Sequence, residues 1–232
     1  MVTRQWLILA FAAAFTFFIV APSLLSVDFP PYPSIQWADV LDLLTPLALI
    51  PLYWLLFTDS GRLSPAMGAT LAFLVLASIW VQGQAMHLGA NSISNLMGVG
   101  TSTIHTLVHF YDEVLSHYLW HLGIIGLSAL LLLFNVGTVA ARAGVRWVLI
   151  VPASILYGLT YFLAVNEGGT VPLGLPAALV IVGGLLVGRR HQLRTHNLVA
   201  FYCLGYAIAL GLLLAWGAYW GGFPEFSEVG LL

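Results

Sequence analysis

Long apolar segments separated by short polar ones dominate the chain. Each is close to or above the ~20 residues that an α-helix needs to cross the hydrocarbon core of a bilayer. The sixth is the shortest, but Pro172 precedes it and Arg189 and Arg190 follow it, so its ends are well marked. The pattern predicts seven transmembrane helices, at about residues 5–26, 38–58, 64–88, 113–136, 145–166, 173–188 and 196–220.

Two segments between the expected helices depart from this pattern. Residues 27–37 contain three prolines, which favour an extended or turning chain before the second helix. Residues 89–103 are too polar and glycine-rich for a membrane span, and we expect a loop there that caps the bundle or dips back into it. From about Thr103 the chain can be helical and run directly into the fourth helix. No repeat or linker interrupts the pattern, so residues 1–232 are predicted to form a single transmembrane domain.

The composition and the placement of charges agree with a membrane protein. Hydrophobic residues make up 60% of the chain and charged residues only 7%, far from the values of soluble domains. All seven arginines fall at one end of a seven-helix model, and the acidic residues fall at the other end, except for Asp59. Positive charge marks the cytoplasmic side, which predicts a cytoplasmic N-terminus and an extracytoplasmic C-terminus. We expect an all-α integral membrane protein, a seven-transmembrane-helix bundle in a bacterial or archaeal cytoplasmic membrane. The arginines are Arg4, Arg62, Arg142, Arg146, Arg189, Arg190 and Arg194.

Several protein classes are excluded by single residues. The lone cysteine, Cys203, lies in an expected helix, which excludes an intrachain disulfide and a thiolate zinc cluster. The chain has no lysine, so it cannot form the Schiff base of a retinal protein. We expect it to be surrounded by membrane lipid and to have no nucleic-acid partner.

Ionisable residues are concentrated in residues 105–121, where the sequence is HTLVHFYDEVLSHYLWH. Four histidines, one aspartate and one glutamate occur in this stretch at the start of the fourth helix. On a regular α-helix they lie within one arc of about 180°, opposite an arc of leucines. Ionisable groups at membrane depth are costly and point to function. We therefore expect this polar arc to face the bundle interior or the water at its end.

The spacing within this stretch favours a metal site. Glu113, His117 and His121 follow one another at intervals of four residues, so neighbours can share an ion, as the two histidines of an H-x-x-x-H helix do in zinc enzymes. His87, near the same end of the third helix, would add a ligand from a second helix. The sequence therefore predicts a divalent metal held by His87, Glu113, His117 and His121. Zinc is favoured, and iron or copper also fits a thiolate-free set of histidines and carboxylates.

A carboxylate that does not bind the metal, Asp112 or Glu113, could act as the general base for a bound water. These features favour a membrane-embedded metal-dependent enzyme, either a zinc hydrolase or an iron or copper oxidase. Its substrate would be a lipid or another small apolar molecule. Further groups are expected to orient the ligands or contact the substrate: Asn91, Asn95, His105, His109 and Ser116.

Other interpretations stay open. Two histidines on adjacent helices could ligate haem axially, and Gly89, Gly123 and Gly126 would leave room for the macrocycle. The cluster could instead relay protons or move a metal in a protein without hydrolase activity. It could also be a hydrogen-bonded interface. Asp39 and Asp42, near the start of the second helix, are best explained as groups that stabilise its N-terminus.

Overall fold

The structure is a computed structural model, which describes residues 4–58, 65–97, 100–135 and 144–231. Arg62, Arg142 and Asp59 lie outside these ranges. Within them, seven helices are long and apolar enough to cross a membrane, the number predicted from the sequence. The elements are α1 (Arg4–Val20) with a short 3₁₀ turn (Ala21–Leu24), β1 (Asp28–Phe29), β2 (Tyr32–Gln36), α2 (Trp37–Thr58), α3 (Met67–Met97), α4 (Thr103–His109), a π-helical segment (Phe110–Leu115), α5 (Ser116–Asn135), α6 (Trp147–Glu167), α7 (Val171–Gly188), a 3₁₀ turn (Arg190–Arg194) and α8 (Asn197–Trp220).

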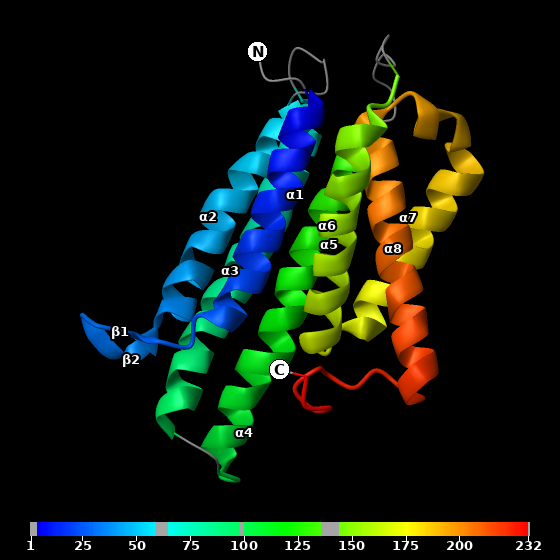
Figure 1. Cartoon of the computed structure of the whole chain (residues 1–232). Coiled ribbons are helices and arrows are strands. Elements are labelled where there is room, and N and C mark those ends of the chain that lie inside the picture. Colours follow the sequence, from blue (N-terminus) through cyan, green and yellow to red (C-terminus); the bar gives the residue numbers. More distant parts are fainter. Residues whose placement is uncertain (1–3, 59–64, 98–99, 136–143, 232) are drawn as a thin grey trace.

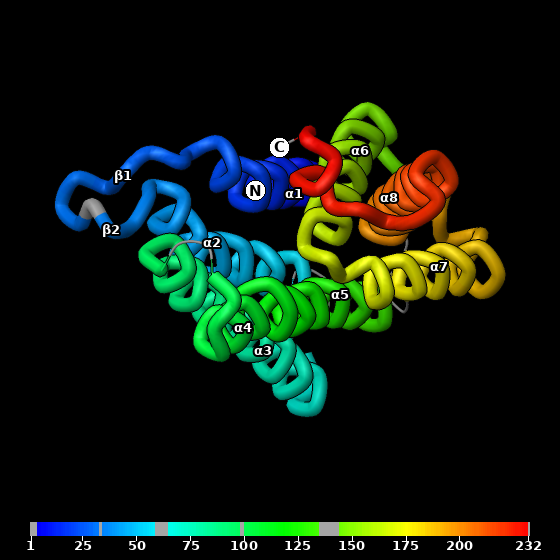
Figure 2. Tube along the Cα trace, turned by 90° about the horizontal axis from the view of Figure 1, so that it is seen from below, coloured from blue at the N-terminus to red at the C-terminus, as the bar shows by residue number. Residues whose placement is uncertain are grey.

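The seven long helical stretches run side by side as a bundle (Figure 1). Viewed along the helices (Figure 2), α1, α6 and α8 form one layer and α2, α3 and α5 form the other, with α7 beside α5 and α8. The short β1–β2 hairpin projects to one side, and α4 extends α5 beyond the other helices. Arg4, Arg146 and the turn Arg190–Arg194 lie at the end of the bundle opposite α4.

The core between the layers is aromatic and carries a buried hydroxyl network. Ser128 Oγ lies 3.2 Å from Tyr53 OH and 3.1 Å from Tyr157 OH. Tyr157 OH in turn donates to Tyr206 OH at 3.1 Å. A polar group away from water costs free energy unless it is hydrogen-bonded, so these mutual bonds allow four hydroxyls to occupy the centre of an apolar bundle. The network ties α2, α5, α6 and α8 together.

The third helix is longer than predicted. We expected a loop from Gly89, but α3 continues to Met97, and the side chain of Ser92 donates to the carbonyl of Leu88 at 2.9 Å. A helix hydrogen-bonds the backbone N–H and C=O groups of such a polar stretch to one another, which explains why α3 continues through it. The loop prediction is therefore wrong for residues 89–97. The prediction of helix from Thr103 is correct, and Ser102 caps its first turn by accepting a hydrogen bond from the backbone N–H of His105.

The π-helical segment between α4 and α5 carries the two adjacent carboxylates. A π-turn inserts extra backbone into a helix and is frequent at functional sites. Here it interrupts the continuous polar arc expected for a regular α-helix. The Asp112 side chain is turned inward and is only 3% exposed, whereas that of Glu113 is 44% exposed. The two neighbouring acids therefore occupy different environments and can have different roles.

Candidate functional site

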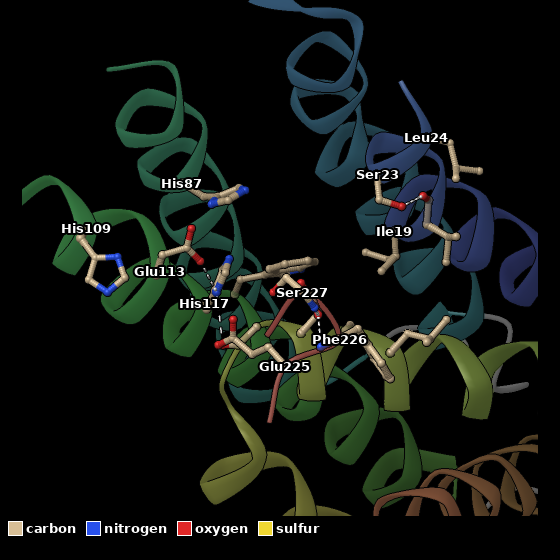
Figure 3. A pocket seen from close by; sticks show the side chains of 16 residues that line it. Ile19, Ser23, Leu24, His87, His109, Glu113, His117, Glu225, Phe226 and Ser227 are labelled. Carbon is tan, nitrogen blue, oxygen red and sulfur yellow. Dashed lines mark hydrogen bonds and ion pairs between the residues drawn. The ribbon is translucent and has the colours of Figure 1, made fainter. Parts of the chain in front are cut away.

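A cavity of about 610 Å³ lies at the α4 end of the bundle (Figure 3). One of its walls is polar and comes from α3, the α4–α5 region, the end of α6 and the C-terminal segment that follows α8. The opposite wall is mainly apolar and comes from α1, the 3₁₀ turn that follows it, and α6. The polar residues of the first wall are His87, His109, Glu113, His117, Glu167 and Glu225. The apolar lining includes Ile19, Val20, Leu24, Leu163, Ala164 and Phe226.

Close packing of α3 against α5 brings the polar side chains of two helices together. A Cβ atom added at Gly83 would lie 2.6 Å from the backbone nitrogen of Trp120 and 2.7 Å from the carbonyl oxygen of Ser116. Glycine is therefore required for the backbones to approach this closely. His87 lies one turn after Gly83 on the same face of α3, so it points at the segment of α5 that begins with Ser116 and His117.

His87 forms an ion-pair contact with the π-helical segment. Its Nδ1 lies 2.9 Å from Asp112 Oδ1, although the oxygen lies off the direction in which the ring N–H would donate. Asp42 of α2 is near enough to interact electrostatically with the same imidazole. A buried carboxylate needs such a partner, because removing its water without compensation is costly. Asp112 thus fixes the position of His87, and the ring stays at the cavity wall.

His117 lies beside His87, with 4.9 Å between the ring centroids. Its Nδ1 is 3.2 Å from the carbonyl oxygen of Gly168, in the turn between α6 and α7. A carbonyl only accepts, so Nδ1 carries the proton and Nε2 is left with a lone pair. Glu113 Oε2 lies 3.7 Å from the same Nδ1. The structure therefore groups His87, Asp112, Glu113 and His117, from two helices and the π-turn.

His121 lies deeper in the bundle and does not line the cavity. It is 1% exposed, and its Nδ1 lies 2.9 Å from the carbonyl oxygen of His117 and 3.0 Å from the hydroxyl of Thr170. The centroids of the His117 and His121 rings are 6.5 Å apart. His121 is therefore a buried side chain whose hydrogen bonds connect α5 to the start of α7.

Ring separations test how well these histidines could share a metal ion. A zinc ion lies ~2.0–2.1 Å from a ligating nitrogen, and hence about 3.2 Å from the ring centroid, so a tetrahedral pair has centroids about 5.2 Å apart and a linear pair about 6.4 Å. The 4.9 Å between the His87 and His117 rings is close to the tetrahedral value, whereas the 6.5 Å between the His117 and His121 rings is at the linear limit, so by distance the first pair is the better placed to share an ion. Across the described part of the chain, no three histidine, cysteine or acidic side chains are gathered as a ready metal site.

The other expected polar groups divide between the cavity and its surroundings. His109 lines the cavity from α4. His105 stays at the start of α4, where its Nδ1 lies 2.7 Å from Ser102 Oγ. Ser116 is buried beneath the cluster and its hydroxyl donates to the backbone carbonyl of Asp112, so it supports the helix and not a ligand.

Asn91 and Asn95 are hydrogen-bonded to Asp39 and to each other. Asn91 donates to Asp39 Oδ1 at 3.3 Å, and Asn95 donates to Asn91 Oδ1 at 3.5 Å. The other carboxylate oxygen of Asp39 accepts from the backbone N–H of Gln36 at 2.7 Å. Asp39 therefore joins the β2–α2 corner to α3, consistent with a stabilising role at the start of α2.

Part of the cavity wall comes from residues that the sequence analysis did not select. Glu167 Oε2 accepts from the backbone N–H of Phe226 at 2.7 Å, and Asn166 donates to the carbonyl of Pro224 at 2.8 Å. These bonds fold residues 221–231, the C-terminal segment, back over the cavity and bring Glu225 to its wall. Burial and the nearby carboxylate of Glu167 raise the pKa of the Glu225 carboxyl above its ordinary value.

The only sequence signal for this part of the wall was that Glu167 and Glu225 belong to the acidic end of the bundle.

Comparisons with models of protein families, with curated proteins and with solved structures find no match for this chain. A bundle architecture alone does not specify a function. The cavity and the chemistry of the side chains around it are therefore the features that indicate a function.

Proposed function

We propose that the chain is a membrane-embedded, metal-dependent enzyme that hydrolyses a lipid or another apolar molecule in the cavity at the α4 end. The observation that carries the proposal is the division of the cavity into an apolar wall and a wall of histidines and carboxylates. Such a site suits an amphiphilic substrate, whose chain would lie along α1 and α6 while its polar part meets the ionisable groups. The arginines at the opposite end of the bundle support an extracytoplasmic position for the cavity.

In this proposal the two adjacent acids have different tasks. Glu113 is at the cavity wall and its side chain is 44% exposed, so it can accept a proton from a water that attacks the substrate. Asp112 is buried and acts as a positioning residue that holds His87. His109, also at the wall, would contact the polar part of the substrate.

The proposed metal ion would be held by His87 and His117. The His117 Nδ1 bonds to a backbone carbonyl, as in many metal-ligating histidines, and the His87 Nδ1 lies 2.9 Å from a carboxylate oxygen, so the Nε2 atom of each ring is left for the ion. A divalent ion would lower the pKa of a bound water and polarise a substrate carbonyl. With two protein nitrogens, it would need Glu113 or water to complete its coordination. Zinc is favoured for hydrolysis, and iron or copper would indicate an oxidase.

Haem is less well supported by the distances. Two imidazoles on opposite faces of one haem iron have centroids about 6.4 Å apart, more than the 4.9 Å between His87 and His117. An absorption spectrum of the purified protein tests this directly, because haem gives an intense Soret band. Such a band would replace the hydrolase proposal with a haem protein.

The experiment for the metal proposal is elemental analysis of protein extracted with a mild detergent. Wild type is expected to hold about one equivalent of zinc, iron or copper, and His87→Ala and His117→Ala are expected to lose it. His105→Ala, at a half-buried position outside the cavity, is the matched control and should retain the metal. Glu113→Gln should leave the protein folded but inactive on a lipid extract. Absence of metal and haem from wild type, together with unchanged lipid turnover in His117→Ala, would overturn the proposal.

A further inference from the structure

An arginine cluster lies at the end of the bundle opposite the cavity, where the start of α6 meets the turn between α7 and α8 (Figure 1). A Cβ atom built on Gly144 would lie 3.9 Å from the carbonyl oxygen of Arg194, and the backbone N–H of Arg146 donates to Asn197 Oδ1 at 3.3 Å. These contacts hold Arg146 beside the turn, although a helical hairpin separates the two in the sequence. The cluster consists of Arg146, Arg189, Arg190 and Arg194.

The positive charge of this cluster is not compensated by the described part of the chain. No ion pair is found there for any of the four guanidinium groups. The described acidic residues lie in the β1–β2 hairpin, at the start of α2, in the π-helical segment, at the end of α6 and in the C-terminal segment, all at the other end of the bundle. The side chains of Arg146, Arg190 and Arg194 are exposed. Neighbouring cations repel one another, and a bound anion would relieve this repulsion.

The surface next to the cluster is apolar. Trp147 and Val148 follow Arg146 at the start of α6, and Val148 is 76% exposed. Leu186 and Val187 lie at the end of α7 just before the turn, and Val187 is 88% exposed. Both helices are long and apolar enough to cross a membrane, so these side chains would face the hydrocarbon of the bilayer directly beside the arginines. A soluble anion would use only the charged part of this surface, whereas an anion with fatty chains would use both parts.

Phosphate is the anion that suits this cluster. The planar guanidinium group of arginine presents two parallel N–H donors to a phosphate. Lipids with an anionic phosphate are found in the cytoplasmic leaflet, the side on which arginines concentrate. The charge of the cluster and the apolar surface beside it therefore match the two parts of one molecule.

We propose that the protein binds an anionic phospholipid at this place, with the lipid phosphate between Arg146 and Arg194 and the acyl chains against Val148 and Val187. The lipid would connect the start of α6 to the turn between α7 and α8. This site is at the opposite end of the bundle from the cavity. It is therefore independent of the proposed enzyme, and neither metal content nor turnover bears on it.

The test is a titration of the purified full chain in a mild detergent, in which bound lipid is counted by native mass spectrometry. The probes are phosphatidylglycerol, which is anionic, and phosphatidylcholine, which is zwitterionic, with identical acyl chains. A basic side chain near an anionic lipid surface contributes about 1 kcal/mol, which is about fivefold in affinity. Phosphatidylglycerol is therefore expected to bind at least about fivefold more tightly than phosphatidylcholine.

Charge-removing variants assign this preference to the cluster. Arg146→Gln and Arg194→Gln should each weaken phosphatidylglycerol binding about fivefold and leave phosphatidylcholine binding unchanged. Because both side chains are exposed, the variants should keep the helical circular dichroism of wild type. Arg4→Gln is the matched control, since it removes the same charge from the same end of the bundle at the start of α1. Equal binding of the two lipids, or an equal loss in Arg4→Gln, would overturn the inference.

Inorganic phosphate distinguishes a lipid site from a site for a soluble anion. It can contact the arginines but cannot use the apolar surface at Val148 and Val187, so millimolar phosphate is expected to leave phosphatidylglycerol bound. Displacement of phosphatidylglycerol by millimolar phosphate would show that the cluster binds a soluble anion and would overturn the proposal of a lipid.

Discussion

Replacement of Gly83 by alanine tests whether close packing of α3 on α5 sets the geometry of the site. The added Cβ would lie 2.6 Å from the backbone nitrogen of Trp120, whereas ordinary van der Waals contact begins at 3.4 Å. The helices must therefore separate by the difference, 0.8 Å, because a backbone atom cannot rotate away. Overpacking of this kind costs about 1–3 kcal/mol, and the gain in helix propensity returns about 0.5–1 kcal/mol.

We expect Gly83→Ala to lower the free energy of unfolding by about 0.5–2 kcal/mol, the difference between these two effects. The His87 and His117 rings should also move apart, so any bound metal should be held more weakly. The assay is unfolding in mixed micelles by increasing denaturing detergent, followed by circular dichroism.

Gly89→Ala is the matched control. Gly89 lies on the same helix, and a Cβ there would have nothing within 4 Å, so only the stabilising effect on the helix should remain. If Gly83→Ala unfolds at the same point as Gly89→Ala, the packing argument is refuted.

Three further predictions concern the ion pair and the C-terminal segment. His87→Ala leaves the buried Asp112 carboxylate without its partner and should lower the free energy of unfolding by about 3 kcal/mol. Adding Asp112→Asn to the His87→Ala protein should restore most of this stability, as measured by thermal unfolding. Glu167→Gln should lower the free energy of unfolding by about 1–2 kcal/mol, because it weakens the bond to the Phe226 N–H. It should also make the C-terminal segment cleavable by limited proteolysis. No change in cleavage would contradict the role of Glu167 in anchoring this segment. Because the pKa of Glu225 is raised in the folded protein, its contribution to stability should be present below the ordinary carboxyl pKa and lost as pH rises through the raised value. Glu225→Gln should remove this part of the pH dependence of unfolding, and an unchanged pH profile would refute it.

The number of helices could be predicted because the apolar runs are long, and a bilayer core requires spans of that length. The approach of His87 to His117 was also foreseeable, since short connections favour antiparallel neighbours. The glycine at position 83 determines how close that approach is, but its packing partners, Ser116 and Trp120, are visible only once the helices are placed.

Other parts of the site depend on contacts that sequence spacing does not encode. The carbonyl of Gly168 fixes the tautomer of His117, although the two residues are separated by an entire helical hairpin. Glu225 reaches the cavity through hydrogen bonds between the end of α6 and the C-terminal segment. The π-turn at residues 110–115 changes the direction of Asp112, and an ideal helical wheel cannot anticipate it.

We propose that the ionisable wall of this cavity carries out chemistry on an amphiphilic molecule. The most direct test is to incubate purified protein in nanodiscs made from a total bacterial lipid extract and to follow the lipids by mass spectrometry. Wild type is expected to deplete one class of lipid with stoichiometric appearance of its cleavage products, and His117→Ala and Glu113→Gln are expected to leave that class intact. Identical lipid profiles for wild type and both variants, with all three proteins folded and the wild type loaded with zinc, would contradict an enzymatic role for this wall.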